Sequence, residues 1–284
     1  MVALVSIEEL TIAPVGQPSL KLVNNVSFAI QSGKTTCVVG ESGSGKSLTA
    51  LSVMGLLSNQ LKRQHGKILF KGQDLTSLNA EKMRELRGSQ IGMIFQEPMT
   101  SLNPVLTVGY QIGESLSVHL GLKGDALKKK VAELLEQVGI PAGRANSYPD
   151  ELSGGQRQRV MIAMSIACEP ALLIADEPTT ALDVTVQAQI LSLLDKLKTS
   201  MNMGMLLITH DFGVVADVAD HVVVMFRGEI VEAGTANQVL NKPKHPYTKA
   251  LLDCVPDAEG KKLLKPIDYA WLKDSKSKKV KVAS

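Results

Sequence analysis

The sequence predicts an α/β protein with a mixed sheet, an N-terminal antiparallel β subdomain and an inserted α-helical subdomain. The apolar runs at residues 35–39 and 171–175 are typical of strands that are buried on both faces of a parallel sheet. Before them, alternating polarity over residues 4–12 and 20–30 predicts two strands. Residues 125–138 instead carry apolar side chains at helical spacing. The opening is therefore expected to be partly antiparallel, with a parallel core that begins near residue 35.

The same patterns predict the remaining elements. A short strand is expected over residues 66–72 and a helix over residues 105–120. Ser153 stands where it can cap a helix over residues 154–168. The later chain predicts, in order, a helix at 186–198, a strand at 205–208 and a hairpin of 221–226 with 229–233.

The composition excludes several classes of protein. Hydrophobic residues make up 44% of the 284 residues, enough for a sizeable core. Aromatic residues make up only 4%, which argues against a base-stacking platform, and no nucleic-acid partner is expected. No apolar run approaches the roughly 20 residues that span a bilayer. The first residues do not show the basic, apolar and small-residue pattern of a leader, so export is not expected. The widely separated Cys37, Cys168 and Cys254 fit a reduced compartment, without a disulfide frame or a cysteine metal site.

Positive charge is concentrated at the C-terminal end. From Lys261 onward eight lysines face two aspartates, so this tail carries +6 and the rest of the chain −3, within an overall +3. A charge block of this kind is typical of a solvated end of the chain. Contact with an anionic membrane surface is the alternative, since each lysine near such a surface adds about 1 kcal/mol.

One glycine-rich segment organises the rest of the chain: Gly40-Glu41-Ser42-Gly43-Ser44-Gly45-Lys46-Ser47. Between a strand and a helix, this G-x-x-x-x-G-K-S pattern predicts a phosphate-binding loop and a P-loop NTPase core. Its glycines let backbone N–H groups surround phosphate oxygens, and the helix N-terminus adds partial positive charge. Lys46 would reach the β- and γ-phosphates, and Ser47 would be a ligand of Mg²⁺. A flexible turn before an ordinary helix is the structural alternative.

Two acidic residues end the apolar run at 171–175. The carboxyl end of a parallel strand is where open α/β sheets bind ligands, and Asp176 and Glu177 are expected there. Asp176 would hold Mg²⁺, usually through water, and Glu177 would polarise a water for attack on the γ-phosphate. Because adjacent carboxylates repel, a bound cation would explain why they occur together. The alternative is an acidic turn before Pro178.

A third motif is Leu152-Ser153-Gly154-Gly155-Gln156, which we call the LSGGQ segment. A serine cap with two glycines at a helix start is an anion site in its own right. Its physical chemistry alone would permit a second, separate anion site.

Taken together, the motifs resemble the ATPase subunit of an ATP-binding cassette (ABC) transporter, over about residues 5 to 250. The glycine loop, the LSGGQ segment, the acidic strand end and residues 208–211 (Ile-Thr-His-Asp) occur in that family's order and spacing. The resemblance implies ATP and Mg²⁺ bound between two such subunits, head to tail. The Ser153–Gln156 helix start of one would face the γ-phosphate held by the loop of the other. An isolated chain is then expected to bind nucleotide and to hydrolyse it poorly.

The resemblance also implies roles for three further residues. Gln96 matches the glutamine that senses Mg²⁺ and the attacking water and that lies beside the membrane partner, so it is expected with Ser47 and Asp176 among the metal ligands. His210 matches the switch histidine that contacts the γ-phosphate and supports Glu177. Asp183 matches the loop that communicates across the dimer. The other histidines are expected to be structural or exposed.

Residues 95–104 and His245-Pro246-Tyr247-Thr248 are similar to the oligopeptide, dipeptide and nickel importer group. The resemblance implies a subunit that powers import by ATP-driven dimer closure and hydrolysis-driven reopening, for peptides or related small solutes. Its partners would be a second ABC ATPase subunit, identical or different, two membrane permease subunits and, indirectly, a solute-binding protein. It would lie peripherally on the cytoplasmic face of the cell (inner) membrane. Residues 1–250 would form the ATPase domain, with the helical insert at about 97–165, and residues 251–284 a short lysine-rich extension.

The chain departs from the family in two places. The family stacks adenine on an aromatic residue of the first hairpin, but residues 10–14 contain none, and a contact of roughly 0.5–1.5 kcal/mol would be missing. We therefore expect weak selectivity between ATP and GTP. Many members of the importer group carry a C-terminal iron–sulfur cluster of cysteines, whereas only Cys254 follows residue 168, so no cluster is expected.

Alternatives from other classes are less compatible with the motifs. An ABC ATPase for nickel, metal-chelate or sugar-derivative uptake differs only in its cargo. A DNA-repair ABC ATPase would carry a long coiled-coil or zinc-bearing insert between the two phosphate motifs. A soluble P-loop kinase or GTPase would not explain the LSGGQ segment. A GTPase would also need an N-K-x-D motif, and the nearest run, residues 241–244, lacks its aspartate.

Overall fold

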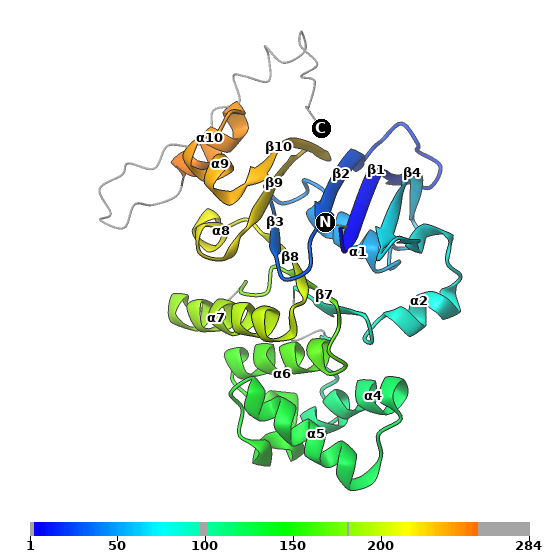
Figure 1. The fold of residues 1–284 in the computed structure, drawn as a ribbon, viewed down its shortest axis with the longest axis vertical. Helices are drawn as coiled ribbons and strands as arrows, with labels where there is room; N and C mark the ends of the chain where they lie inside the picture. Colours follow the sequence, from blue (N-terminus) through cyan, green and yellow to red (C-terminus); the bar gives the residue numbers. More distant parts are fainter. Residues whose placement is uncertain (1–2, 97–100, 181, 255–284) are drawn as a thin grey trace.

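The computed structural model describes residues 3–96, 101–180 and 182–254, whose arrangement is shown in Figure 1. Outside the described residues lie residues 97–100 of the segment 95–104 that resembles the importer group, Ala181, and the lysine-rich tail. The domain boundaries at 97, 250 and 251 remain predictions.

A six-stranded sheet forms the centre of the molecule, in the order β10-β9-β3-β8-β7-β6. Its strands are β3 (Thr35–Val39), β6 (Ile91–Ile94), β7 (Leu172–Asp176), β8 (Gly204–Thr209), β9 (His221–Phe226) and β10 (Glu229–Thr235). The neighbours from β6 to β9 pair in parallel, and β10 pairs antiparallel to β9 at the edge. Every residue of β3, β6, β7 and β8 is buried, which confirms the prediction of a parallel core of doubly covered strands.

A second, antiparallel sheet is formed by the first part of the chain, in the order β2-β1-β4-β5. Its strands are β1 (Val5–Pro14), β2 (Val23–Ile30), β4 (Leu61–Phe70) and β5 (Gln73–Asp74). Figure 1 shows this sheet to one side of the central sheet, with α1 (Lys46–Val53) beside it. The antiparallel opening predicted from alternation is confirmed.

The central sheet separates two hydrophobic cores. Successive side chains of a strand point to opposite faces, and in β3 Val38 packs into the core shared with the antiparallel sheet and α1. Its neighbours Cys37 and Val39 pack into the other core, which contains the helical part of the protein. Each buried strand therefore contributes side chains to both cores. Residues just after the end of such a strand lie at the boundary between the two cores.

Helix α2 (Ala80–Leu86) packs with α1 in the core that contains Val38. The core that contains Cys37 and Val39 takes residues from α4 (Val108–Leu120), α5 (Gly124–Gln137), α6 (Gly154–Ile166), α7 (Val184–Met201), α8 (Phe212–Val218), α9 (Ala236–Asn241) and α10 (Pro246–Asp253). Single 3-10 turns occur at Leu75–Ser77, Ala142–Asn146 and Pro149–Glu151. In Figure 1, α4, α5 and α6 gather at one end of the molecule, away from the antiparallel sheet. Among the described helices, none combines the length and the apolar character needed to cross a lipid bilayer.

Several predicted boundaries were wrong by a few residues. β2 begins at Val23 and not at residue 20, since residues 16–21 are exposed and lie in turns outside the sheet. β4 begins at Leu61 and not at residue 66, because its first half pairs with β1 although most of its side chains are exposed. The sequence reasoning did not predict α2, β6, α8, α9 or α10, which have four to eight residues and are too short to show a period.

Candidate nucleotide-binding and hydrolysis site

The loop of residues 40–47, the phosphate loop, joins the end of β3 to the start of α1 as predicted. Gly40 has a φ of +151°, and a Cβ there would come within 2.1 Å of the Met225 carbonyl oxygen. Gly45 has a φ of +100°, and its Cβ would lie 3.0 Å from the Leu22 carbonyl oxygen. Glycine is required at both positions because the loop packs directly on the neighbouring backbone.

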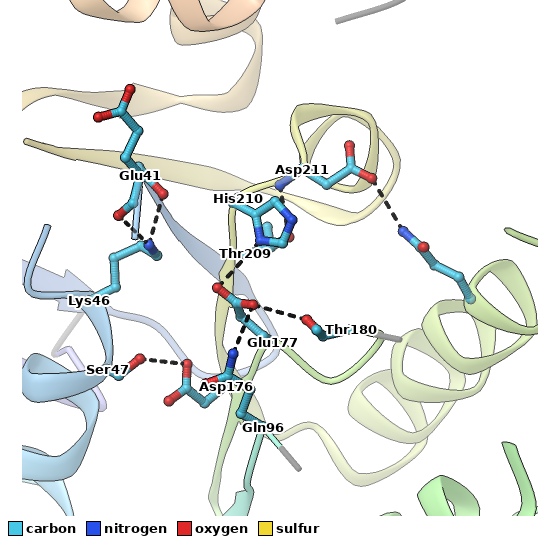
Figure 2. Close-up of polar contacts among 12 residues, drawn as sticks. Glu41, Lys46, Ser47, Gln96, Asp176, Glu177, Thr180, Thr209, His210 and Asp211 are labelled. Carbon is cyan, nitrogen blue, oxygen red and sulfur yellow. Dashed lines mark hydrogen bonds and ion pairs between the residues drawn. The ribbon is translucent and has the colours of Figure 1, made fainter. Parts of the chain in front are cut away.

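The Lys46 ammonium group lies inside this loop (Figure 2). Its Nζ donates to the carbonyl oxygens of Gly40, at 2.8 Å, and of Glu41, at 2.9 Å. Burial lowers the pKa of Lys46 below its ordinary value, and the negative charges of Glu177, Asp176 and Glu41 oppose that shift. The loop thus encloses a cation with acidic groups beyond it.

The phosphate loop fits the phosphates of a nucleotide. Helix α1 follows Gly45, so no side chain caps it, and its first turn carries no acidic residue. The uncapped N–H groups and the helix dipole favour an anion there. Within the described residues, the Ser44 hydroxyl is buried without a hydrogen-bond partner. A ligand oxygen would satisfy this donor, because buried polar groups in proteins are nearly always paired.

Ser47 and Asp176 form the second part of the site. The Ser47 hydroxyl donates to Oδ1 of Asp176 at 3.0 Å, from the start of α1 to the end of β7. Burial and the charge of Glu177 raise the pKa of Asp176, and the hydrogen bond from Ser47 and the charge of Lys46 oppose this. Two adjacent oxygen ligands suit Mg²⁺, which takes few protein ligands and keeps water and phosphate oxygens. No group of three or more His, Cys, Asp or Glu side chains able to hold a metal occurs in residues 3–96, 101–180 and 182–254.

The Glu177 carboxylate is held by three side chains (Figure 2). Gln96 donates its amide to Oε2 at 3.2 Å, the Thr180 hydroxyl donates to the same oxygen at 2.9 Å, and Nδ1 of His210 lies 3.4 Å from Oε1. Glu177 adopts a φ of +47°, in the left-handed region that non-glycine residues rarely occupy. Such backbone conformations cluster at functional sites, where the surrounding structure supports them.

Strand order explains why these residues meet. β7 lies between β6 and β8, and all three run in parallel. Gln96 follows β6, Glu177 follows β7 and His210 follows β8, so all three emerge at the same edge of the sheet. The structure places the Gln96 amide on Glu177, whereas its assignment as a metal ligand stays a prediction.

Thr180 was missed by the sequence reasoning. It follows Glu177 in a turn in which the Thr180 N–H donates to the Glu177 carbonyl oxygen at 3.2 Å. A hydroxyl three residues after a candidate base, across a proline, is a local signal that could have identified it, because such a turn returns the chain to its starting residue.

The LSGGQ segment and Asp183 lie outside this cluster. Ser153 caps α6 by accepting from the Gln156 N–H at 3.3 Å, and the Gln156 side chain accepts from the Ser153 N–H at 3.0 Å, as a capping box. Asp183 caps α7 by accepting from the Val186 N–H at 2.9 Å. In the described part of the chain, no hydrogen bond or ion pair joins Ser153–Gln156 to the phosphate loop or to Glu177.

Comparisons with known proteins agree with this geometry. The family described as ABC transporter matches residues 23–180, and the family described as Oligopeptide/dipeptide transporter, C-terminal region, matches residues 231–273. A protein of Brucella ovis named as a peptide import ATP-binding protein is 54% identical over 242 residues, which cover 82% of this chain and 72% of the relative. The glutathione import ATP-binding protein GsiA of Escherichia coli is 49% identical over 277 residues, 93% of this chain and 43% of GsiA.

A solved structure resembles most of this fold. The ATP-binding cassette MJ0796, a dimer in a post-hydrolysis state bound to ADP and Pi, superposes with a TM-score of 0.73 at 28% identity, over 82% of this chain and 98% of that chain. The resemblance drawn from the four motifs, and the fold class, are therefore confirmed. The chain belongs to the ABC transporter family and is one of its ATP-binding, ATP-hydrolysing subunits.

Proposed function

We propose that the chain powers the import of peptides or related small solutes across a membrane. Two relatives are named for the import of peptides and of glutathione, itself a small peptide. The match at residues 231–273 to an oligopeptide/dipeptide transporter region supports the same cargo class. Nickel, metal chelates and sugar derivatives are the competing cargoes.

The observation that carries the chemistry is the Glu177 carboxylate, held by Gln96, Thr180 and His210 beside the phosphate loop. The loop of residues 40–47 binds the phosphates of ATP, and Lys46 reaches the β- and γ-phosphates. Ser47, Asp176 and Gln96 would hold Mg²⁺, which would supply positive charge to the phosphate oxygens. Glu177 orients a water and accepts its proton, and His210 keeps the carboxylate aligned.

A second ATPase subunit completes the site. Within the described residues, no hydrogen bond or ion pair joins the LSGGQ segment or Asp183 to the phosphate loop of the same chain, and Val184 next to Asp183 is 83% exposed. In the proposed dimer, Leu152, Ser153, Gly154, Gly155 and Gln156 of one subunit cover the nucleotide held by the other. The partner is a second copy or a related subunit.

We further propose a peripheral position on the cytoplasmic face of the cell (inner) membrane. There the ATPase pair would dock on two permease subunits, which receive solute from a solute-binding protein. ATP binding closes the dimer, and hydrolysis reopens it, so the permeases alternate between two states.

Uptake in cells tests the cargo. A strain that lacks the gene would be supplied with radiolabelled tripeptide, with Ni²⁺ and with a labelled sugar derivative in separate assays. Peptide uptake is expected to fall to background and to return with the wild-type gene but not with Lys46→Ala. Unchanged peptide uptake together with lost nickel or sugar uptake would reject the peptide assignment and keep the ATPase role.

A further inference from the structure

The segment His245-Pro246-Tyr247-Thr248 has no part in the chemistry described above, yet it reaches the nucleotide site. Tyr247 lies in α10 and is fully buried. Its hydroxyl accepts a hydrogen bond of 3.0 Å from the backbone N–H of Glu41, 206 residues earlier in the chain. The C-terminal helix is thereby joined directly to the phosphate loop.

The Tyr247 ring is itself fixed in place. It packs on Phe226, with ring centroids 4.4 Å apart and an interplanar angle of 46°. Phe226 ends β9, and in the following turn the Gly228 N–H donates to the Ser44 carbonyl oxygen at 3.0 Å. The loop is therefore anchored at Glu41 by α10 and at Ser44 by the β9–β10 turn.

The anchor at Glu41 determines the surroundings of Lys46. The Glu41 N–H and the Gly40 carbonyl belong to one planar trans peptide, so they point in opposite directions. Because the N–H faces Tyr247, the carbonyl faces the interior of the loop, where it accepts from Lys46 Nζ at 2.8 Å. Gly40 has the backbone freedom of a glycine, and the peptide could turn without this bond.

The loop borders open space next to these two anchors. A surface hollow of about 390 Å³ is bordered by Glu41, Ser42, Gly43, Ser44, Phe226 and Arg227. The two backbone hydrogen bonds at Glu41 and Ser44 therefore lie where the loop is not covered on all sides.

We propose that Tyr247 is a positioning residue for nucleotide binding, which acts through the Gly40–Glu41 peptide on Lys46. This inference rests on the proposed role of the phosphate loop in binding ATP. Helix α10 would then contribute to nucleotide binding through the bond from the Glu41 N–H to the Tyr247 hydroxyl. A loop fixed in its binding conformation binds more tightly, because less conformational freedom is lost on binding.

The variant Tyr247→Phe removes the hydroxyl and keeps the ring on Phe226. In the full-length chain, titration with a fluorescent ATP analogue is expected to give a Kd about three- to tenfold higher, the range that corresponds to one lost hydrogen bond. In the assembled transporter, KM for ATP is expected to rise similarly and kcat to stay within about twofold, because Glu177 and its partners are unchanged. Hydrogen exchange at the Glu41 amide is expected to accelerate.

Thr235→Val is the matched control. It also removes one hydroxyl from the C-terminal region, where Thr235 caps α9 by accepting from the Gln238 N–H at 3.3 Å. It is expected to lower thermal stability without changing the Kd for the ATP analogue or the exchange of the Glu41 amide.

The outcomes separate this inference from the proposed function. If wild type binds the analogue and Tyr247→Phe binds it as tightly or more tightly, the positioning role is overturned and ATP binding stands. Equal loss of affinity in Thr235→Val, or a fall in kcat with KM unchanged, would also overturn it. A wild-type chain that binds no nucleotide would reject both.

Discussion

The Nδ1 atom of His210 lies 3.4 Å from Oε1 of Glu177, at the ends of two neighbouring parallel strands. The Glu177 side chain is 15% exposed and the His210 side chain 62%, so the carboxylate is mostly shielded from solvent while the histidine is open to it. Gln96 and Thr180 hold the other carboxylate oxygen. This arrangement leaves one oxygen of Glu177 dependent on His210 for its orientation.

Replacing His210 should therefore impair hydrolysis more than binding. His210→Ala is expected to lower kcat of the assembled transporter by about 10- to 100-fold, at or below the lower end of the roughly 10²- to 10⁴-fold contribution of a direct acid–base group, because His210 orients Glu177 and does not itself accept the proton. The Kd for ATP should change less than about threefold. His65→Ala is the control, because His65 pairs with Glu9 on the antiparallel sheet, away from the site. A similar loss of kcat in both variants would contradict the assignment.

Ser47 should couple nucleotide binding to Mg²⁺. Ser47→Ala removes the hydrogen-bond partner of Asp176 and one of the oxygen ligands proposed for Mg²⁺. The gain in ATP affinity on adding Mg²⁺ should therefore shrink by about tenfold, roughly the effect of one hydrogen bond to a charged group. The measurement is an ATP titration at several Mg²⁺ concentrations. Ser52→Ala, on the same helix but bonded to the Leu48 carbonyl oxygen, should behave as wild type. An unaltered Mg²⁺ dependence in Ser47→Ala would remove Ser47 from the metal site.

Base selectivity should be weak. No aromatic side chain occurs in residues 10–14, and Val15 just beyond β1 is 60% exposed. A missing ring contact of roughly 0.5–1.5 kcal/mol removes the main preference for adenine. In competition against a labelled ATP analogue, the GTP concentration that displaces half of the analogue is expected to lie within about threefold of the ATP concentration that does so. A marked preference for ATP would show that another side chain reads the base.

The free energy of unfolding should depend on pH through Asp220, which lies at the end of the sheet away from the nucleotide site. Burial pushes the pKa of Asp220 upward, but hydrogen bonds from Lys34 and the Thr35 N–H and the charges of Lys34 and Lys198 outweigh it and lower the pKa below its ordinary value. A lowered carboxyl pKa adds stability that is complete above the unfolded value of 3.8 and is lost as pH falls through the folded value.

The variant Asp220→Asn is thus expected to lower the free energy of unfolding at pH 7 by about 1 kcal/mol. The difference in the free energy of unfolding between wild type and Asp220→Asn should decrease below about pH 4, because the wild-type carboxyl is then protonated. Urea unfolding at pH 7 and at pH 3 measures it. An equal difference at both values would show that the ion pair contributes nothing and that the effect is steric.

The parts of the site that were predicted are those in which neighbouring residues carry the whole signal. The phosphate loop, the Ser153 cap and the acid pair at the end of β7 are each local in sequence, and the structure has them where the pattern placed them. The contact between Gln96 and Glu177 was not readable from local pattern, because it depends on β6 pairing with β7 across 81 residues. Tyr247 was visible as part of a motif, but its bond to Glu41 arises only when α10 folds back over β9.

The substitution Glu177→Gln tests most directly whether Glu177 is the base that accepts a proton from the attacking water. It keeps the size of the side chain and removes the negative charge that accepts a proton from water. In the assembled transporter, ATP binding should stay within about threefold of wild type, while hydrolysis falls by about 100-fold or more. The ATP-bound dimer should also live longer, as measured by light scattering after gel filtration. Hydrolysis at the wild-type rate would contradict the assignment of Glu177 as the base.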